Sequence, residues 1–145
     1  MESEIIMKDL LKQYSFYKDR KVMLERRSVY LQSLIENEGD DFDKGIYKGP
    51  LDEYLNKAKD EIAIELHSIQ NEMPKITYLL GKVDLALAMV AGYDEKYKLI
   101  IESFYIKKIR MENISDSMHI SRSSCYEIKN KAISYMAKVI FGATI

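Results

Sequence analysis

The chain has 145 residues and a formal net charge of −1 at neutral pH, and 47% of its residues are hydrophobic. This apolar content is enough for a buried core, so disorder over the whole length is not expected. With 6 Gly and 2 Pro, the chain lacks the turn residues that a β-sandwich or barrel needs, which favours a few long helices. The single Cys125 excludes a disulfide framework and a Cys-based zinc site.

The sequence shows neither a secretion signal nor a membrane segment. Its N-terminus, MESEIIMKDLLK, carries acidic residues where a signal peptide needs a basic region. The most apolar stretch, residues 85–93, has nine residues, whereas a membrane-spanning helix requires roughly 20. We therefore expect a cytoplasmic protein with no membrane partner.

Charge is distributed unevenly along the chain. Residues 94–145 contain nine Lys and Arg against six Asp and Glu, a net charge of +3, and residues 1–93 have a net charge of −4. A basic C-terminal third next to an acidic segment favours a small nucleic-acid-binding unit.

Two long helices are predicted in the first 92 residues. Residues 3–37 carry apolar side chains at helical spacing, namely Ile6, Leu10, Tyr14, Tyr17, Leu24, Leu31 and Leu34. Residues 36–50 contain Gly39, Gly45, Gly49 and Pro50 and predict the one long loop.

The second long helix shows a stripe close to a heptad repeat over 40 residues. Its members are Leu51, Leu55, Ala58, Ile62, Leu66, Ile69, Met73, Ile76, Leu80, Val83, Leu87 and Val90. The stripe keeps its phase across Pro74, which indicates a kink rather than a break, and Gly92 is a candidate C-terminal cap. The stripe packs either on residues 3–37 or on a second subunit, so a homodimer through residues 51–90 stays open.

Three shorter helices are predicted after residue 93. Asp94 is a candidate N-cap for a helix over 94–107, which should turn Leu99, Ile100, Ile101, Phe104 and Tyr105 inward. A helix over 111–118, a turn at 119–121 and a helix over 122–140 with Ser121 as its N-cap then have the layout of a helix-turn-helix.

The last helix has two different faces. Its apolar stripe consists of Cys125, Ile128, Ala132, Met136 and Ile140, and the opposite side carries Ser123, Glu127, Asn130 and Ser134. Short hydrogen-bonding side chains flanked by Lys and Arg are what a helix in the major groove requires. The N–H groups that follow Ser121 also favour a phosphate.

The segment ISRSSCYEIKNKAI resembles the recognition helix of region 4 of the bacterial sigma factors. The matching positions are Ser121, Arg122, Cys125, Ile128, Lys131, Ala132 and Ile133, and ENISDSMHI is similar to the helix that precedes it in that family. His119 stands where that family commonly has Gly. The arrangement of the whole chain is similar to the phage late-gene regulators of the ArpU and RinA kind.

The resemblance implies which residues contact DNA. The base-facing positions correspond to Arg122, Ser123, Tyr126 and Glu127, and the helical wheel adds Asn130. Ser123 and Tyr126 differ from the main sigma factors, so their promoter specificity is not transferred. The residues expected to hold phosphates are Lys107, Lys108, Arg110, Lys129 and Lys131.

We therefore expect an all-α protein with a long helical hairpin or coiled-coil extension over residues 1–92 and a helix-turn-helix DNA-binding domain over 93–145. The expected function is regulation, most simply activation, of phage or mobile-element genes at double-stranded promoter DNA together with host RNA polymerase. The alternative is a helical adaptor that binds polymerase or a repressor. No enzyme activity, cofactor or metal is expected.

Overall fold

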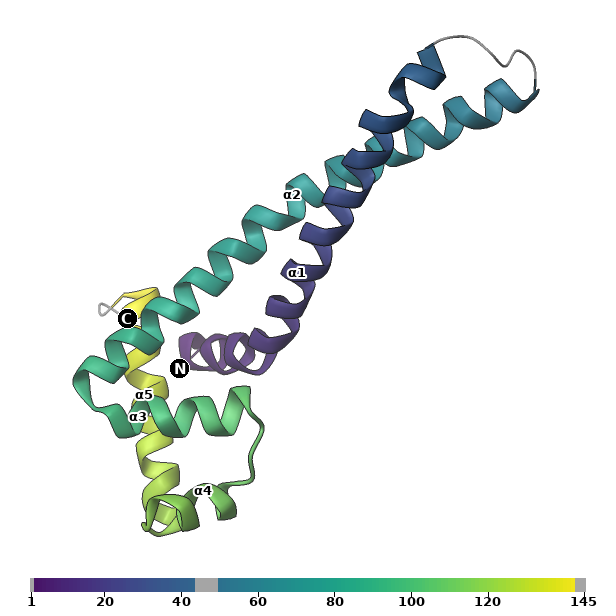
Figure 1. Cartoon of the computed structure of the whole chain (residues 1–145). Coiled ribbons are helices and arrows are strands. Elements are labelled where there is room, and N and C mark those ends of the chain that lie inside the picture. The colour runs from purple at the N-terminus through teal and green to yellow at the C-terminus, as the bar shows by residue number, and fades with distance from the viewer. Residues whose placement is uncertain (1, 44–49, 143–145) are drawn as a thin grey trace. The chain divides into compact units, whose positions relative to one another are not determined.

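The protein is helical throughout the part that the structure, a computed structural model, describes, which is residues 2–43 and 50–142. No strand occurs in these two ranges. In chain order the elements are α1 (Glu2–Asp43), α2 (Pro50–Tyr93), α3 (Glu95–Ile101), the π-helix η1 (Glu102–Ile106), α4 (Met111–Met118) and α5 (Arg122–Phe141) (Figure 1). The predicted all-α fold, two long helices followed by shorter ones, is confirmed.

The long helices extend further than the sequence predicts. Helix α1 continues through Gly39 to Asp43, because an isolated Gly inside a helix costs only about 1 kcal/mol relative to Ala. The predicted loop over 36–50 therefore begins too early, and its residues 44–49 lie outside the described residues. Gly92 lies inside α2 instead of capping it, since the helix runs to Tyr93.

The chain divides into two compact units. Unit 1 comprises Met1–Lys18 and Tyr78–Ile145, and unit 2 comprises Asp19–Thr77. This division does not coincide with the expected domains 1–92 and 93–145, because the N-terminal turns of α1 and the last turns of α2 belong to the same unit as the C-terminal helices.

Unit 2 is an antiparallel pair of helical segments from α1 and α2. The Arg20 guanidinium donates two 2.9 Å hydrogen bonds to the Glu72 carboxylate, and Arg27 binds Glu65 in the same bidentate way at 2.8 and 3.1 Å. The apolar seam between the segments contains the buried residues Leu24, Leu31, Leu66 and Ile69. In this unit the heptad stripe of α2 therefore packs on α1 of the same chain.

Helix α2 is apolar over a longer stretch than residues 85–93. Residues Asn56–Tyr93 are long and apolar enough to cross a membrane when judged by length and composition alone. The heptad stripe is the reason, because it adds apolar side chains upstream of residues 85–93. A core helix meets the same criterion, and Val83, Leu87 and Val90 are buried inside unit 1.

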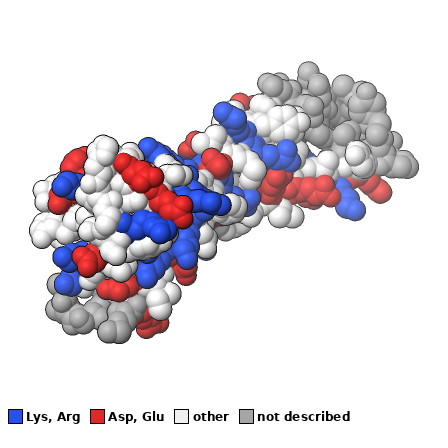
Figure 2. All heavy atoms as spheres, turned by 90° about the horizontal axis from the view of Figure 1, so that it is seen from below, with Lys and Arg blue, Asp and Glu red and all other residues white. Residues whose placement is uncertain are grey.

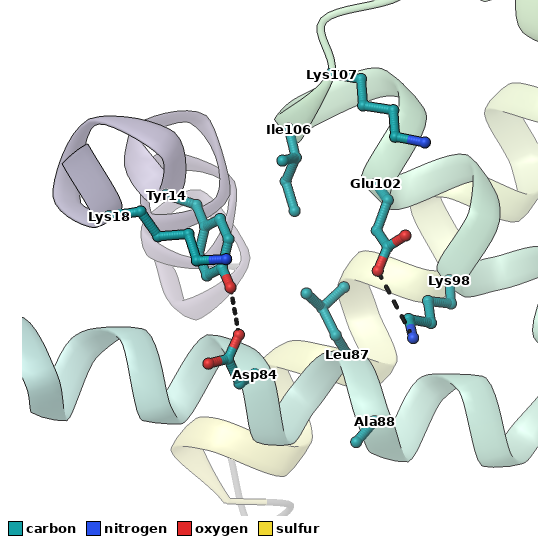
Figure 3. A pocket seen from close by; sticks show the side chains of 9 residues that line it. All are labelled: Tyr14, Lys18, Asp84, Leu87, Ala88, Lys98, Glu102, Ile106 and Lys107. Atoms are coloured by element: carbon teal, nitrogen blue, oxygen red, sulfur yellow. Dashed lines mark hydrogen bonds and ion pairs between the residues drawn. The ribbon is translucent and has the colours of Figure 1, made fainter. Parts of the chain in front are cut away.

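The N-terminal turns of α1 are anchored inside unit 1. Their buried side chains are Met7, Leu11 and Tyr14, so the predicted stripe through Ile6 and Leu10 is wrong by one residue. The hydroxyl of Tyr14 donates a short hydrogen bond to the carboxylate of Asp84 on α2, and both side chains point toward each other at a cavity of about 280 Å³ (Figure 3). These contacts place α1 beside the C-terminal helices of the unit.

The helix predicted over 94–107 is two elements. Asp94 caps α3 as predicted, since its side chain accepts a 2.9 Å hydrogen bond from the Lys96 N–H. From Glu102 the backbone widens into the π-helix η1, and the Lys107 N–H donates to the Glu102 carbonyl at 2.8 Å. Of the five side chains predicted to point inward, Leu99 is 48% exposed, which corrects that position.

Replacing Tyr14 by Phe should lower stability and change its dependence on pH. Burial first and the Asp84 carboxylate second raise the pKa of Tyr14 from 10.0 to about 12. The protonated hydroxyl therefore stabilises the fold fully below the unfolded pKa, and this stabilisation is lost as the pH rises toward 12. We expect Tyr14→Phe to lower the free energy of unfolding by about 1–2 kcal/mol at neutral pH. Between these two pKa values, the free energy of unfolding should decline less with pH in the variant than in the wild type.

Urea unfolding at neutral pH and at a series of alkaline pH values measures this effect. Tyr17→Phe is the matched control, because the Tyr17 hydroxyl makes no hydrogen bond to the described residues. Parallel stability curves for Tyr14→Phe and the wild type above the unfolded pKa would show that the Tyr14 hydroxyl does not contribute as stated.

Candidate nucleic-acid interface

One edge of α5 is held by an apolar cluster in unit 1. The cluster consists of Ile100 on α3, Met111 and Ile114 on α4, and Cys125 on α5. It is completed by the half-buried side chains of Phe104, Met118, Ile120 and Ile128. Burial in this apolar environment raises the pKa of the Cys125 thiol, so Cys125 acts as a small core residue, as expected. Both α3 and α4 contact α5.

The turn between α4 and α5 has the predicted location and depends on three residues. His119 ends α4 in the left-handed conformation, with φ 58° and ψ 37°, which Gly adopts without strain and a residue with a side chain adopts less readily. Ile120 then points back to the core cluster. Ser121 caps α5, because its Oγ accepts a 3.1 Å hydrogen bond from the Ser124 N–H.

Burial confirms the predicted orientation of α5 and limits its free surface to the first half of the helix. Cys125 is fully buried, whereas Ser123, Glu127 and Asn130 are exposed. Further along, the side chains at 132, 133, 136 and 137 are all buried. The predicted stripe missed positions 133 and 137, which widen the buried face. Ser134 is consequently half-buried rather than free.

The five predicted base-contacting residues are all exposed on the first half of α5, although two of them already have partners. Arg122 forms a 3.2 Å ion pair with Glu112 on α4, in which both side chains remain more than half exposed. The ring of Tyr126 is 44% exposed and makes an edge contact with Phe104, with the ring centroids 6.4 Å apart. Their roles in reading bases stay predictions.

Four of the five predicted phosphate-binding residues are exposed cations, and the fifth is in a different environment. The exposed side chains are Lys107, Lys108, Arg110 and Lys131. Lys129 is half-buried, with Nζ 4.9 Å from the Phe104 ring centroid, 5.1 Å from that of Tyr126 and 5.9 Å from that of Tyr105. Burial, followed by repulsion from Lys8 and Lys12, lowers the pKa of its ammonium group.

The aromatic group around Lys129 was not predicted from the sequence. Phe104 and Tyr105 belong to η1, and their rings meet edge to face with centroids 5.0 Å apart. Helical spacing predicted a regular α-helix here, and no sequence signal marks the π-helix. Such single-turn distortions are frequent at functional sites. This one places the rings of Phe104 and Tyr105 next to Lys129 of α5.

Basic side chains lie next to one another at several places on the surface, as the face drawn in Figure 2 shows. At other places on that face, acidic and basic side chains alternate. No group of three or more metal-binding side chains occurs among the described residues. The candidate interface thus consists of the exposed polar face of α5, with further exposed cations on α5 and on the loop before α4.

A comparison with protein families matches residues 52–137 to the family described as a protein of unknown function, DUF1492. The match covers more than half of the chain and includes α3, η1, α4 and most of α2 and α5. The chain belongs to this family. Neither the curated proteins nor the solved structures contain a significant match.

Replacing Ser121 by Ala should weaken the interface by releasing the first turn of α5. The Ser121 cap satisfies one backbone N–H that has no partner within the helix, and its loss typically costs about 1 kcal/mol. We expect this decrease in the free energy of unfolding for Ser121→Ala and only a few tenths for Ser121→Gly, measured by thermal or urea unfolding.

Ser117→Ala is the control, because Ser117 is exposed on α4 and its side chain makes no hydrogen bond to the described residues. An equal loss of stability in Ser121→Ala and Ser117→Ala would contradict the capping role.

Proposed function

We propose that the protein is a sequence-specific DNA-binding transcriptional regulator that places the first half of α5 in the major groove. The observation that carries this proposal is the orientation of α5. Its apolar edge is buried against α3 and α4, so Ser123, Glu127 and Asn130 are free to contact base edges. In a helix-turn-helix the N-terminal part of the second helix contacts the bases.

The surroundings of α5 support the same proposal. The loop between η1 and α4 contributes the exposed cations Lys107, Lys108 and Arg110, and α5 itself contributes Lys131. Phosphate contacts provide most of the affinity and set the register, while short polar side chains discriminate the bases. Unit 1 therefore contains both the cations that phosphate binding requires and the polar side chains that base discrimination requires.

We further propose that the protein acts in phage or mobile-element gene regulation, as the similarity to the ArpU and RinA regulators and to sigma factor region 4 implies. An activator of this type would bind promoter DNA beside host RNA polymerase in the cytoplasm. The net charge of −4 over residues 1–93 suits contacts with a basic protein surface, which is the role that the adaptor alternative assigns to the long helices.

A homodimer through α2 remains part of the proposal. Within unit 2, Tyr54 and Ile64 of α2 are each 69% exposed, and within unit 1 Tyr78 is 64% exposed. Two copies would present two recognition helices to half-sites about one helical turn apart. Sedimentation equilibrium of the full chain, alone and with DNA, measures the stoichiometry.

Replacing Asn130 by Ala should relax base preference at one position of the bound site. A well-placed amide is worth about 1–3 kcal/mol of discrimination against the wrong base, and the Asn130 side chain is exposed on α5. Selection of bound sequences from random duplexes with the full chain measures this change. Asn71→Ala, an exposed substitution in unit 2, should leave the selected sequence unaltered. A uniform loss across all sequences would contradict a base-reading role for Asn130.

Replacing Lys131 by Gln should weaken binding to every duplex equally. Loss of one phosphate contact lowers the slope of log affinity against log salt concentration by about 0.9 without changing the preferred sequence. Fluorescence anisotropy across a KCl series measures the slope, with Lys57→Gln in unit 2 as the control of equal charge. If wild-type binding to duplex DNA shows no dependence on salt, the proposed function is wrong and the adaptor alternative is favoured.

A further inference from the structure

The N-terminal turns of α1 carry two lysines and contact the segment that joins η1 to α4. Lys8 and Lys12 are four residues apart and therefore lie on the same face of α1. After burial, repulsion from these two lysines contributes to the lowered pKa of Lys129. Lys8 and Lys12 on α1 precede Lys129 on α5 by more than 100 residues in the chain.

Direct contacts hold α1 against the loop that precedes α4. The Lys108 ammonium group donates a 3.4 Å hydrogen bond to the Lys12 carbonyl. The Ser15 hydroxyl donates one of 3.5 Å to the Ile106 carbonyl. Lys108 has a positive φ of 57°, which is uncommon for a residue with a side chain. The N–H groups on both sides of Lys108 bind the backbone of η1, since Lys107 donates to the Glu102 carbonyl and Ile109 to the Ser103 carbonyl.

Four cations of unit 1 come from α1, from the loop before α4 and from α5. We call Lys8, Lys12, Lys108 and Lys129 the lysine cluster. No carboxylate of the described residues lies within ion-pair distance of any of its members. Like charges that approach without a counter-ion repel one another, so the cluster is electrostatically incomplete in the protein alone.

Lys129 gives the cluster a defined position relative to α5. Its ammonium group is held over the rings of Phe104, Tyr105 and Tyr126, and Tyr126 is one of the exposed residues of the recognition face. An anion bound at Lys129 therefore lies close to that face. A DNA backbone presents phosphates at regular intervals beside the groove that a recognition helix occupies.

We infer that Lys8 and Lys12 of α1 join Lys108 and Lys129 to hold the phosphate backbone of DNA beside the groove that α5 enters. This inference rests on the proposed function and extends its interface to the N-terminus of the chain. The first turns of α1 are then part of the DNA-binding surface and not only part of a helical extension.

The double variant Lys8→Gln with Lys12→Gln in the full chain tests the inference. Each lost phosphate contact contributes about 0.9 to the salt slope, so we expect the slope on random duplex DNA to fall by about one to two. The preferred sequence should stay the same, because phosphates carry no base identity. Lys8→Arg with Lys12→Arg should keep a slope close to that of the wild type.

The matched control is Lys57→Gln with Lys96→Gln. It removes the same charge from two exposed lysines, one in unit 2 and one at the start of α3 in unit 1. We expect its salt slope to equal that of the wild type. An equal decrease in both double variants would reduce the effect to net charge and overturn the inference.

The outcomes separate this inference from the proposed function. If the wild type binds DNA and Asn130→Ala changes base preference, but Lys8→Gln with Lys12→Gln keeps the full salt slope, only the inference is wrong. If the wild type does not bind duplex DNA, both are wrong. If the double variant loses affinity for poly-glutamate but keeps its DNA slope, the cluster binds an acidic protein surface, and the inference is overturned in favour of that partner.

Discussion

The surface chemistry of unit 1 depends on the burial of one edge of α5. Ile100, Ile114 and Cys125 meet in one apolar cluster, so α3 and α4 fix the rotation of α5 about its own axis. A rotation of half a turn would expose Cys125 and bury the polar residues at 123, 127 and 130. Burying them without partners costs a few kcal/mol each, so the observed orientation is strongly favoured.

The same packing reaches beyond the helix-turn-helix. Tyr14 of α1 binds Asp84 of α2, and Lys108 binds the backbone of α1 at Lys12. These contacts cross a sequence separation of 70 and 96 residues. The compact unit that contains α5 therefore includes both ends of the chain. A DNA-binding domain defined by residues 93–145 alone would lack the buried side chains of Met7 and Leu11.

The helix ends that depend on local chemistry could be predicted. The caps at Asp94 and Ser121, the limits of α4 and the turn at His119 follow from side chains that act on their neighbours in the chain. The end of α1 was predicted too early, since Gly39 only weakens a helix. Gly92 was misassigned as a cap because Asp94, two residues later, provides the stronger signal for the chain reversal.

The candidate interface likewise combines features that the local sequence predicts with features that it does not. Apolar and polar spacing by itself determined which side of α5 faces solvent, because the period of a helix is set by its backbone. Only the tertiary structure decided that Lys129 is packed over three rings, that the backbone widens at η1, and that Lys108 binds the backbone of α1 at Lys12. The physical reason is that these features arise from contacts between distant segments, whose energies no local pattern of residues contains.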